Sequence, residues 1–248
     1  MPVADSTNRR SVASRAEASE VGTVSPSRRL RRGYVSLGAV SNGRTIVYID
    51  GHNFYHGCVK KHPEFKWLDL LAMASRLTGR NGTIDLVRYY TARVIDYPDD
   101  PQQSQRQDVY LKALVATGVE VIEGHFVERN KRVKLKKTGR YETAIVAEEK
   151  GSDVNLAADL VHDACTRTPD LAVVISNDSD LQRAVHLAMG CEVTVYTVNP
   201  HRSGNQRPKL FGSGSLNIRR WHLAQSQLPL VVVDSNGKSW HRPPEWSS

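Results

Sequence analysis

The chain has 248 residues, of which 40% are hydrophobic, and a formal net charge of +8 at pH 7, which suits one α/β domain with tails or at most two small domains. Three scattered cysteines without a Cys-x-x-Cys pair argue against a zinc knuckle or a disulfide framework, and they favour a reducing, cytoplasmic setting. No apolar run is long enough to cross a bilayer and no apolar segment near the N-terminus resembles a secretory signal, so we expect no membrane partner.

The positive charge is concentrated at the N-terminus. Residues 1–44 contain eight arginines and three acids, a net of +5, which leaves +3 for the rest of the chain. Residues 1–43 lack any apolar period, so we expect them to form a disordered basic tail. Such a tail serves either as a solubilising segment or as an electrostatic arm for a polyanionic partner.

Strand-like and helix-like segments alternate between residues 44 and 200, which predicts one α/β domain with a mostly parallel sheet. The expected strands are residues 45–49, 86–93, 119–123, 171–176 and 192–197. The expected helices are residues 67–77, 105–114, 152–165 and 180–188.

Two further segments lie outside this alternation. Residues 125–148 predict a β-hairpin inserted into the domain, and seven of the twelve residues from Arg129 to Arg140 are Lys or Arg. Residues 201–248 are expected to form a C-terminal extension that packs on the domain, with one strand at 228–234 and a tight turn at Asn236-Gly237.

Aspartates follow two of the predicted strands. Asp50 ends the first strand, and Asp178 and Asp180 follow the fourth. Ligands of open parallel sheets bind outside the carboxyl ends of the strands, so these three carboxylates should open onto one edge. A single Asp after a strand is often only a helix cap or a turn residue, but two such strand ends favour a site.

Asp153 is the fourth candidate. At 100° per residue it shares one helix face with Leu156, Leu160 and Ala164, so we expect its carboxylate to point inward; the alternative role is to complement the helix dipole. Asp159 and Asp163 are expected on the opposite, solvated face.

Converging carboxylates repel one another unless a cation offsets their charge. Lys150 could offset part of it. A hard divalent cation would offset more, and all-oxygen ligands favour Mg²⁺ or Mn²⁺ over zinc. Such ions can activate water and stabilise the leaving oxygen of a phosphodiester.

Three motifs resemble those of NYN domains, a branch of the PIN-like nuclease superfamily. They are Ile49-Asp50-Gly51-His52-Asn53, a Lys-Gly-x-Asp-Val type of run from Lys150 to Val154, and Ser176-Asn177-Asp178-Ser179-Asp180. The resemblance covers residues 45–199 and implies a Rossmann-like three-layer sandwich. It also implies a metal-dependent RNA-cleaving site built on Asp50, Asp153, Asp178 and Asp180, in which Asn53 orients a metal ligand or touches phosphate. Asn177 departs from the family, where many members have Gly.

The expected substrate is therefore RNA, single-stranded in the simplest case, cleaved with Mg²⁺ or Mn²⁺. Lys134, Lys136, Lys137 and Lys150 are the candidate phosphate contacts, although a solvated charged loop remains the alternative for the hairpin. Two other functions stay open. One is a non-catalytic RNA-binding adaptor, and the other is a haloacid-dehalogenase-type phosphatase, which would need an Asp where His52 stands. The sequence leaves open whether the chain forms a homo-oligomer.

Overall fold

The structure is a computed structural model that describes residues 43–79, 84–134, 139–166, 169–201 and 207–246. The predicted tail therefore lies outside the described residues, apart from Gly43. No described helix has the length and apolar character needed to cross a bilayer.

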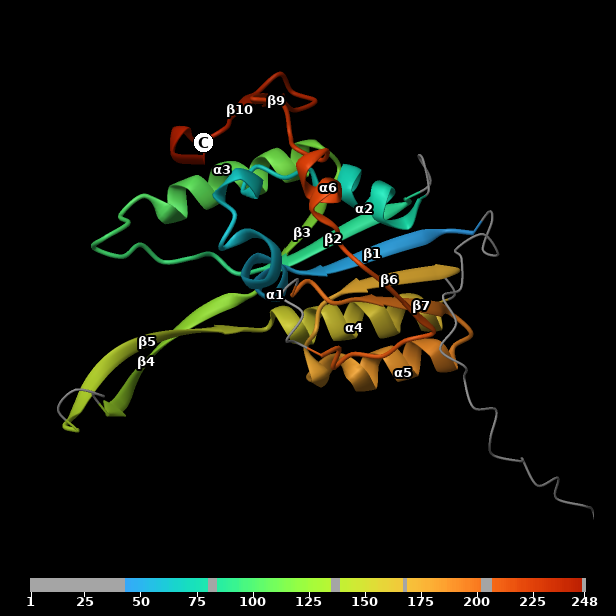
Figure 1. Cartoon of the computed structure of the whole chain (residues 1–248), viewed down its shortest axis with the longest axis horizontal. Coiled ribbons are helices and arrows are strands. Elements are labelled where there is room, and N and C mark those ends of the chain that lie inside the picture. The colour runs from blue at the N-terminus through green and yellow to red at the C-terminus, as the bar shows by residue number, and fades with distance from the viewer. Residues whose placement is uncertain (1–42, 80–83, 135–138, 167–168, 202–206, 247–248) are drawn as a thin grey trace, which may run out of the picture. The chain divides into compact units, whose positions relative to one another are not determined.

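A six-stranded, fully parallel sheet forms the centre of the fold, as the alternation of strands and helices predicts (Figure 1). Its strand order is β3-β2-β1-β6-β7-β8. Five strands match the predicted ones to within a few residues, whereas the edge strand β8 was not expected. The strands are β1 (Thr45–Asp50), β2 (Leu86–Thr91), β3 (Glu120–Glu123), β6 (Leu171–Ile175), β7 (Thr194–Val198) and β8 (Gly214–Leu216).

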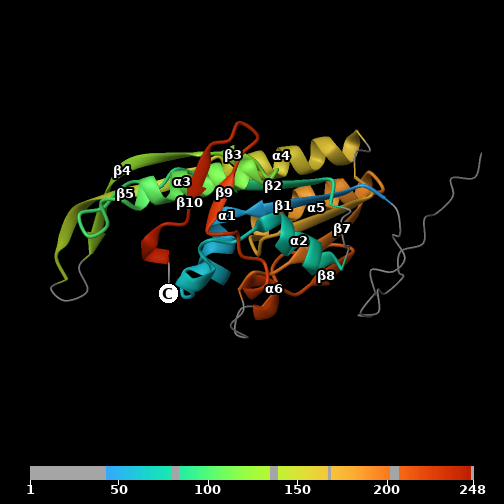
Figure 2. The same ribbon diagram turned by 90° about the horizontal axis from the view of Figure 1, so that it is seen from above.

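Helices cover both faces of this sheet (Figures 1 and 2). One face packs against α2 (Leu70–Thr78), α3 (Gln103–Ala116) and α6 (Arg220–Ala224), and the other against α4 (Ser152–Cys165) and α5 (Gln182–Gly190). Successive side chains of β1 alternate between the two cores, because a strand points its side chains to opposite faces in turn. The three-layer arrangement is therefore the predicted one.

The strand order reverses between β1 and β6, which is the topological switch point of such a sheet. From β1 the chain crosses one face to β2 and β3, whereas from β6 it crosses the other face to β7. The helices that follow β1 and β6 lie on opposite faces of the sheet, so the carboxyl ends of these two strands border a crevice. After β1 the chain continues into the short helix α1 (Gly51–Phe54) and a π-helical turn, Tyr55–Val59.

The basic insertion is a separate two-stranded ribbon of β4 (His125–Lys134) and β5 (Tyr141–Lys150). The predicted hairpin is thus present, with longer strands than expected. In both views the ribbon extends away from the central sheet (Figures 1 and 2). One residue, Gly124, separates the end of β3 from the start of the ribbon at the carboxyl edge of the sheet. β5 returns the chain to the same edge just before α4.

The C-terminal residues pack along α3. β9 (Val231–Val233) and β10 (Ser239–His241) pair as a small hairpin, and Gly237 in its turn has φ of +80°. The strand expected at 228–234 is therefore shorter, while the turn lies where it was predicted. Trp246 is buried against Trp67 and Tyr110, which fixes the end of the described chain on the domain.

Asp163 corrects the expectation for α4. It is buried rather than solvated: its carboxylate accepts from the Tyr48 hydroxyl at 2.7 Å and pairs with the Arg88 guanidinium at 2.5 Å. At 100° per residue Asp163 lies only about 20° from Leu156, so it belongs to the edge of the buried face. Asp159 is half-buried and accepts from the Tyr90 hydroxyl at 3.0 Å, so it too faces the sheet.

Replacing Asp163 by Asn should lower the free energy of unfolding by about 3 kcal/mol, because it leaves the Arg88 charge without its buried partner. The matched control is Glu120→Gln, which removes the other acid on Arg88. The Glu120 side chain is 48% exposed, against 8% for Asp163, so the control should cost less than about 1 kcal/mol. Urea denaturation measures the free energy of unfolding of both variants. Equal losses would show that the buried ion pair contributes no more to stability than the exposed one.

Candidate active site

Asp50 is the buried centre of the site. It is the last residue of β1, only 3% exposed, and its carboxylate is held on both oxygens. Oδ1 accepts from the main-chain N–H of Asn53 at 2.9 Å, and Oδ2 accepts from the Ser176 hydroxyl at 2.7 Å. Asp50 therefore caps α1 through the N–H of Asn53, as a lone Asp after a strand often does. Its contact with Ser176 is not part of this cap.

Ser176 extends this contact across the switch point. Its hydroxyl donates to Asp50 and accepts from the main-chain N–H of Asp178 at 3.0 Å. Asp178 in turn accepts from the N–H of Asp180 at 2.9 Å and so caps the 3₁₀ turn Ser179–Leu181. A continuous set of hydrogen bonds thus runs from the end of β1 to the acids that follow β6. Ser176 lies in the third motif, but its residue type alone predicts no such role.

Asn53 ties the same two strand ends together from the other side. Its side-chain carbonyl oxygen accepts from the main-chain N–H of Asn177 at 3.1 Å and lies 3.1 Å from Nε2 of His201. Asn53 therefore fixes the loop that carries Asp178. His201 was not predicted as part of the site, because a single histidine after a strand carries no distinctive signal in the sequence.

Asn177 connects the site to the chain beyond β7. Its carbonyl oxygen accepts from the N–H of Lys209 at 2.8 Å, and its amide donates to the carbonyl of Arg207 at 3.3 Å. A glycine could make neither bond. The departure from the family pattern at this position thus gives this chain an anchor for residues 207–209 beside the carboxylates.

Asp153 lies at the rim of the site. It lies in the first turn of α4 and is exposed, so it is not buried with the apolar residues of its helix face as the sequence suggested. Partial burial, followed by the charges of Asp50 and Asp178, raises its pKa to about 6. Asp180 adds to this rise and His52 opposes it. The charges of Asp50, Asp178 and Asp180 therefore all raise the pKa of Asp153.

The acids form no closed metal cage. Among the described residues, no three His, Cys, Asp or Glu side chains come together in a group that could hold a metal ion. The four-ligand site expected from the sequence is therefore not preformed. The donor set still suits Mg²⁺ or Mn²⁺, because Mg²⁺ keeps several waters and commonly binds through only one or two carboxylates. Asp153, Asp178 and Asp180, each open to solvent to some degree, fit such a hydrated ion.

The candidate phosphate-binding lysines lie on or next to the ribbon. Lys134 is exposed near the end of β4, and its ammonium group is 5.8 Å from the centroid of the Tyr141 ring. Lys136 and Lys137 fall outside the described residues. Lys150 is exposed at the end of β5, three residues before Asp153.

Comparison with known proteins gives two informative matches. The family model described as NYN domain matches residues 44–209. The 6-hydroxy-3-succinoylpyridine 3-monooxygenase HspA of Pseudomonas putida (strain DSM 28022 / S16) is 31% identical over an alignment of 240 positions, which covers 82% of this chain and 77% of that protein.

Two solved structures are similar more remotely. A protein of unknown function from Vibrio parahaemolyticus RIMD 2210633 has a TM-score of 0.47 at 15% identity and covers 75% of this chain and 96% of its own. The T. acidophilum isopentenyl phosphate kinase, in a product complex, has a TM-score of 0.33 at 10% identity and covers 71% and 100%. Both likenesses are too weak to inform function.

The raised pKa of Asp153 predicts how Asp153→Asn changes stability with pH in the absence of metal. A folded-state pKa near 6, above the ordinary 3.8, means that the folded chain binds this proton more tightly, so stability falls as pH rises from about 4 to 6. The Asn variant should therefore melt at a higher temperature than the natural chain at pH 7.5 in EDTA, and the difference should disappear at pH 4. Calorimetry at the two pH values measures this. A variant that melts at or below the natural chain at pH 7.5 would show that burial and the neighbouring acids do not destabilise the charged form of Asp153.

Proposed function

Because this chain belongs to the NYN domain family, we propose that it is a metal-dependent ribonuclease that hydrolyses RNA phosphodiester bonds at the switch point of its sheet. The proposal rests on the convergence of Asp50, Asp178 and Asp180 on Asp153, whose pKa is raised first by burial and then by the charges of these three acids. A surface that only bound RNA would have no reason to gather negative charge beside the phosphate path.

The residues divide into two roles in this proposal. Asp50, held by Ser176 and Asn53, is the fixed anion of the site. Asp153, Asp178 and Asp180 would hold Mg²⁺ or Mn²⁺, which when bound lowers the pKa of a water and stabilises the charge that develops on the leaving oxygen. The side chains then orient the hydrated ion at the edge of the crevice.

Basic side chains near the acids offer a path for the RNA backbone. His56 lies beside His52, Lys60 and His201, and burial followed by these three groups lowers its pKa. Lys209 lies close enough to His201 to lower that residue's pKa, although burial is the larger cause. Together with the ribbon, Lys60 and Lys209 would neutralise phosphates approaching the carboxylates, whereas His56 and His201, whose pKa values are lowered, carry no charge at neutral pH.

The named relative favours a second candidate from another class, namely oxidation of a small pyridine compound. The P. putida protein is described as a 6-hydroxy-3-succinoylpyridine 3-monooxygenase and is 31% identical to this chain. Ring hydroxylation, however, gives no role to a basic ribbon beside the site. Incubation of the purified chain with that pyridine, O₂ and a reduced nicotinamide, followed by ring absorbance, tests this candidate directly.

The ribonuclease proposal predicts that labelled single-stranded RNA is cleaved with Mn²⁺ and left intact in EDTA. Asp178→Asn should reduce the cleavage rate on the order of 10²-fold or more, since it removes charge from the ion's binding site while keeping the side-chain shape. The control is Glu192→Gln, an exposed acid at the opposite edge of the sheet, which should keep the full rate. Full activity in EDTA, or equal losses in the two variants, would contradict the proposal.

The ribbon gives a separate prediction about binding. If Lys134, Lys136 and Lys137 contact phosphates, their joint replacement by Ala should flatten the log–log salt dependence of RNA binding by up to about 2 units, at about 0.7 per contact. Affinity should fall similarly for different RNA sequences, because phosphate contacts carry no base information. Fluorescence anisotropy across a salt series in the Asp178→Asn background measures the slope. An unchanged slope would place the RNA elsewhere.

A further inference from the structure

A cavity of about 350 Å³ lies beside the carboxylates, on the other side of α1. Its walls come from α1 and the π-helical turn, from the carboxyl end of β2, from α3, and from Trp246 near the C-terminus. This volume is in the range of small-molecule sites and is large enough for one substituted ring. None of the acids proposed to hold a metal lines it, so it is distinct from the hydrolytic centre.

Aromatic side chains dominate this cavity. They come from five separate parts of the chain, and Tyr110 and Trp246 meet edge to face with their ring centroids 6.0 Å apart. Flat apolar walls of this kind favour a planar ring over a flexible or strongly charged ligand. The six aromatic residues are Phe54, Tyr55, Phe65, Tyr89, Tyr110 and Trp246.

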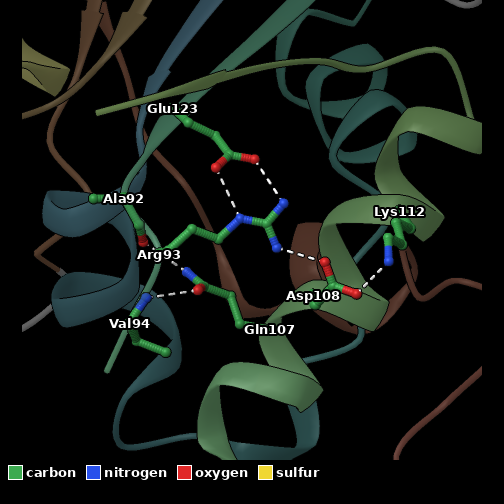
Figure 3. Close-up of polar contacts among 7 residues, drawn as sticks. All are labelled: Ala92, Arg93, Val94, Gln107, Asp108, Lys112 and Glu123. Atoms are coloured by element: carbon green, nitrogen blue, oxygen red, sulfur yellow. Dashed lines mark hydrogen bonds and ion pairs between the residues drawn. The ribbon is translucent and has the colours of Figure 1, made fainter. Parts of the chain in front are cut away.

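One wall of the cavity is held rigid by polar contacts (Figure 3). The Gln107 amide donates to the carbonyl of Ala92 at 2.9 Å and accepts from the N–H of Val94 at 2.8 Å, which locks α3 to the end of β2. Arg93 continues this network by pairing with Glu123 at 2.7 Å and Asp108 at 2.5 Å. A preformed wall spares an incoming ring the cost of ordering it.

Polar groups in the lining could recognise the edge of a nitrogen heterocycle. Tyr55, His56 and Thr91, which all have polar side chains, line the cavity. Arg106 also lines it, but its guanidinium is engaged by Asp100 at 2.6 Å and lies 3.7 Å from Glu245. Lys66 also lines the cavity, with its ammonium group 5.9 Å from the centroid of the Trp246 ring. The cavity thus has polar side chains for a ring, one cation that is paired with acids and a second that lies over an aromatic ring.

The cavity adjoins the acids through two residues. Gly51 and His52 line it and directly follow Asp50, and the His52 ring is close enough to Asp153 to lower the pKa of that acid. Gly51 must lack a side chain here, because a Cβ would lie 2.5 Å from the carbonyl oxygen of Tyr90. The cavity therefore begins at the two residues that follow Asp50, so a ligand with its ring in the cavity would have its other end near the acids.

We propose that this cavity binds a planar nitrogen heterocycle, namely the base of the nucleotide that adjoins the scissile phosphate. The inference rests on the proposed ribonuclease function and names the part of the substrate that this chain reads. The same ring chemistry occurs in free pyridine compounds, so the test separates the two sources.

The test measures binding in EDTA, where no metal-dependent cleavage can occur, by calorimetry with three probes. Adenosine 5′-monophosphate should bind saturably, whereas ribose 5-phosphate, which lacks the ring, should not. The third probe is 6-hydroxy-3-succinoylpyridine. Tyr55 is 39% exposed, so Tyr55→Ala should fold, and it should weaken nucleotide binding about 10-fold, the effect of losing one ring contact to a base.

The matched control is Phe211→Ala, which removes an aromatic side chain that is 58% exposed and lies outside the cavity; it should bind the nucleotide like the natural chain. Binding of the pyridine alone would overturn the assignment to a nucleobase. No ring binding, equal binding of ribose 5-phosphate, or equal losses in the two variants would overturn the cavity proposal altogether. Because metal is absent, these outcomes are independent of whether RNA is cleaved.

Discussion

The buried carboxylate of Asp50 is the constraint on which the site depends. A carboxylate that is 3% exposed is costly unless hydrogen bonds replace its water, and here the Ser176 hydroxyl and the N–H of Asn53 do so. These donors come from the ends of two strands that are adjacent in the sheet but more than 120 residues apart in the chain. Satisfying one buried anion therefore fixes the crevice, and it leaves Asp178 and Asp180 at its open side.

Charge accumulation then explains what the crevice can do. Burial, followed by the charges of Asp50 and Asp178, raises the pKa of Asp153, so a positive charge at the rim of the site would be stabilised. In the function that we propose, the acids bind the cation, the basic side chains bind phosphate and the cavity binds the base. This combination suits a nucleic-acid substrate better than any one of the three features alone.

The sequence predicted the parts of this structure that have a local or periodic signal. Long strands such as β1 and β6, the full extent of α4 and the basic hairpin have such a signal, and so do the strand-end aspartates. β8 could not be predicted, because three residues, Gly214–Leu216, become a strand only through pairing with β7. The contacts of Asp163 and the anchor formed by Asn177 could not be predicted either, because both join residues that are far apart in the sequence. For Asp153 the sequence identified the helix face correctly, but it could not show that the first turn of this helix is exposed.

The central claim is that the acids at the switch point bind a divalent cation. Electron paramagnetic resonance of Mn²⁺ titrated into the purified chain tests this most directly, because free and bound Mn²⁺ give different signals. We expect saturable binding that weakens as pH falls below about 6, where Asp153 takes up a proton, and that is lost in the double variant Asp178→Asn, Asp180→Asn. An absence of saturable Mn²⁺ binding at pH 7.5, or equal binding by the double variant, would contradict the account.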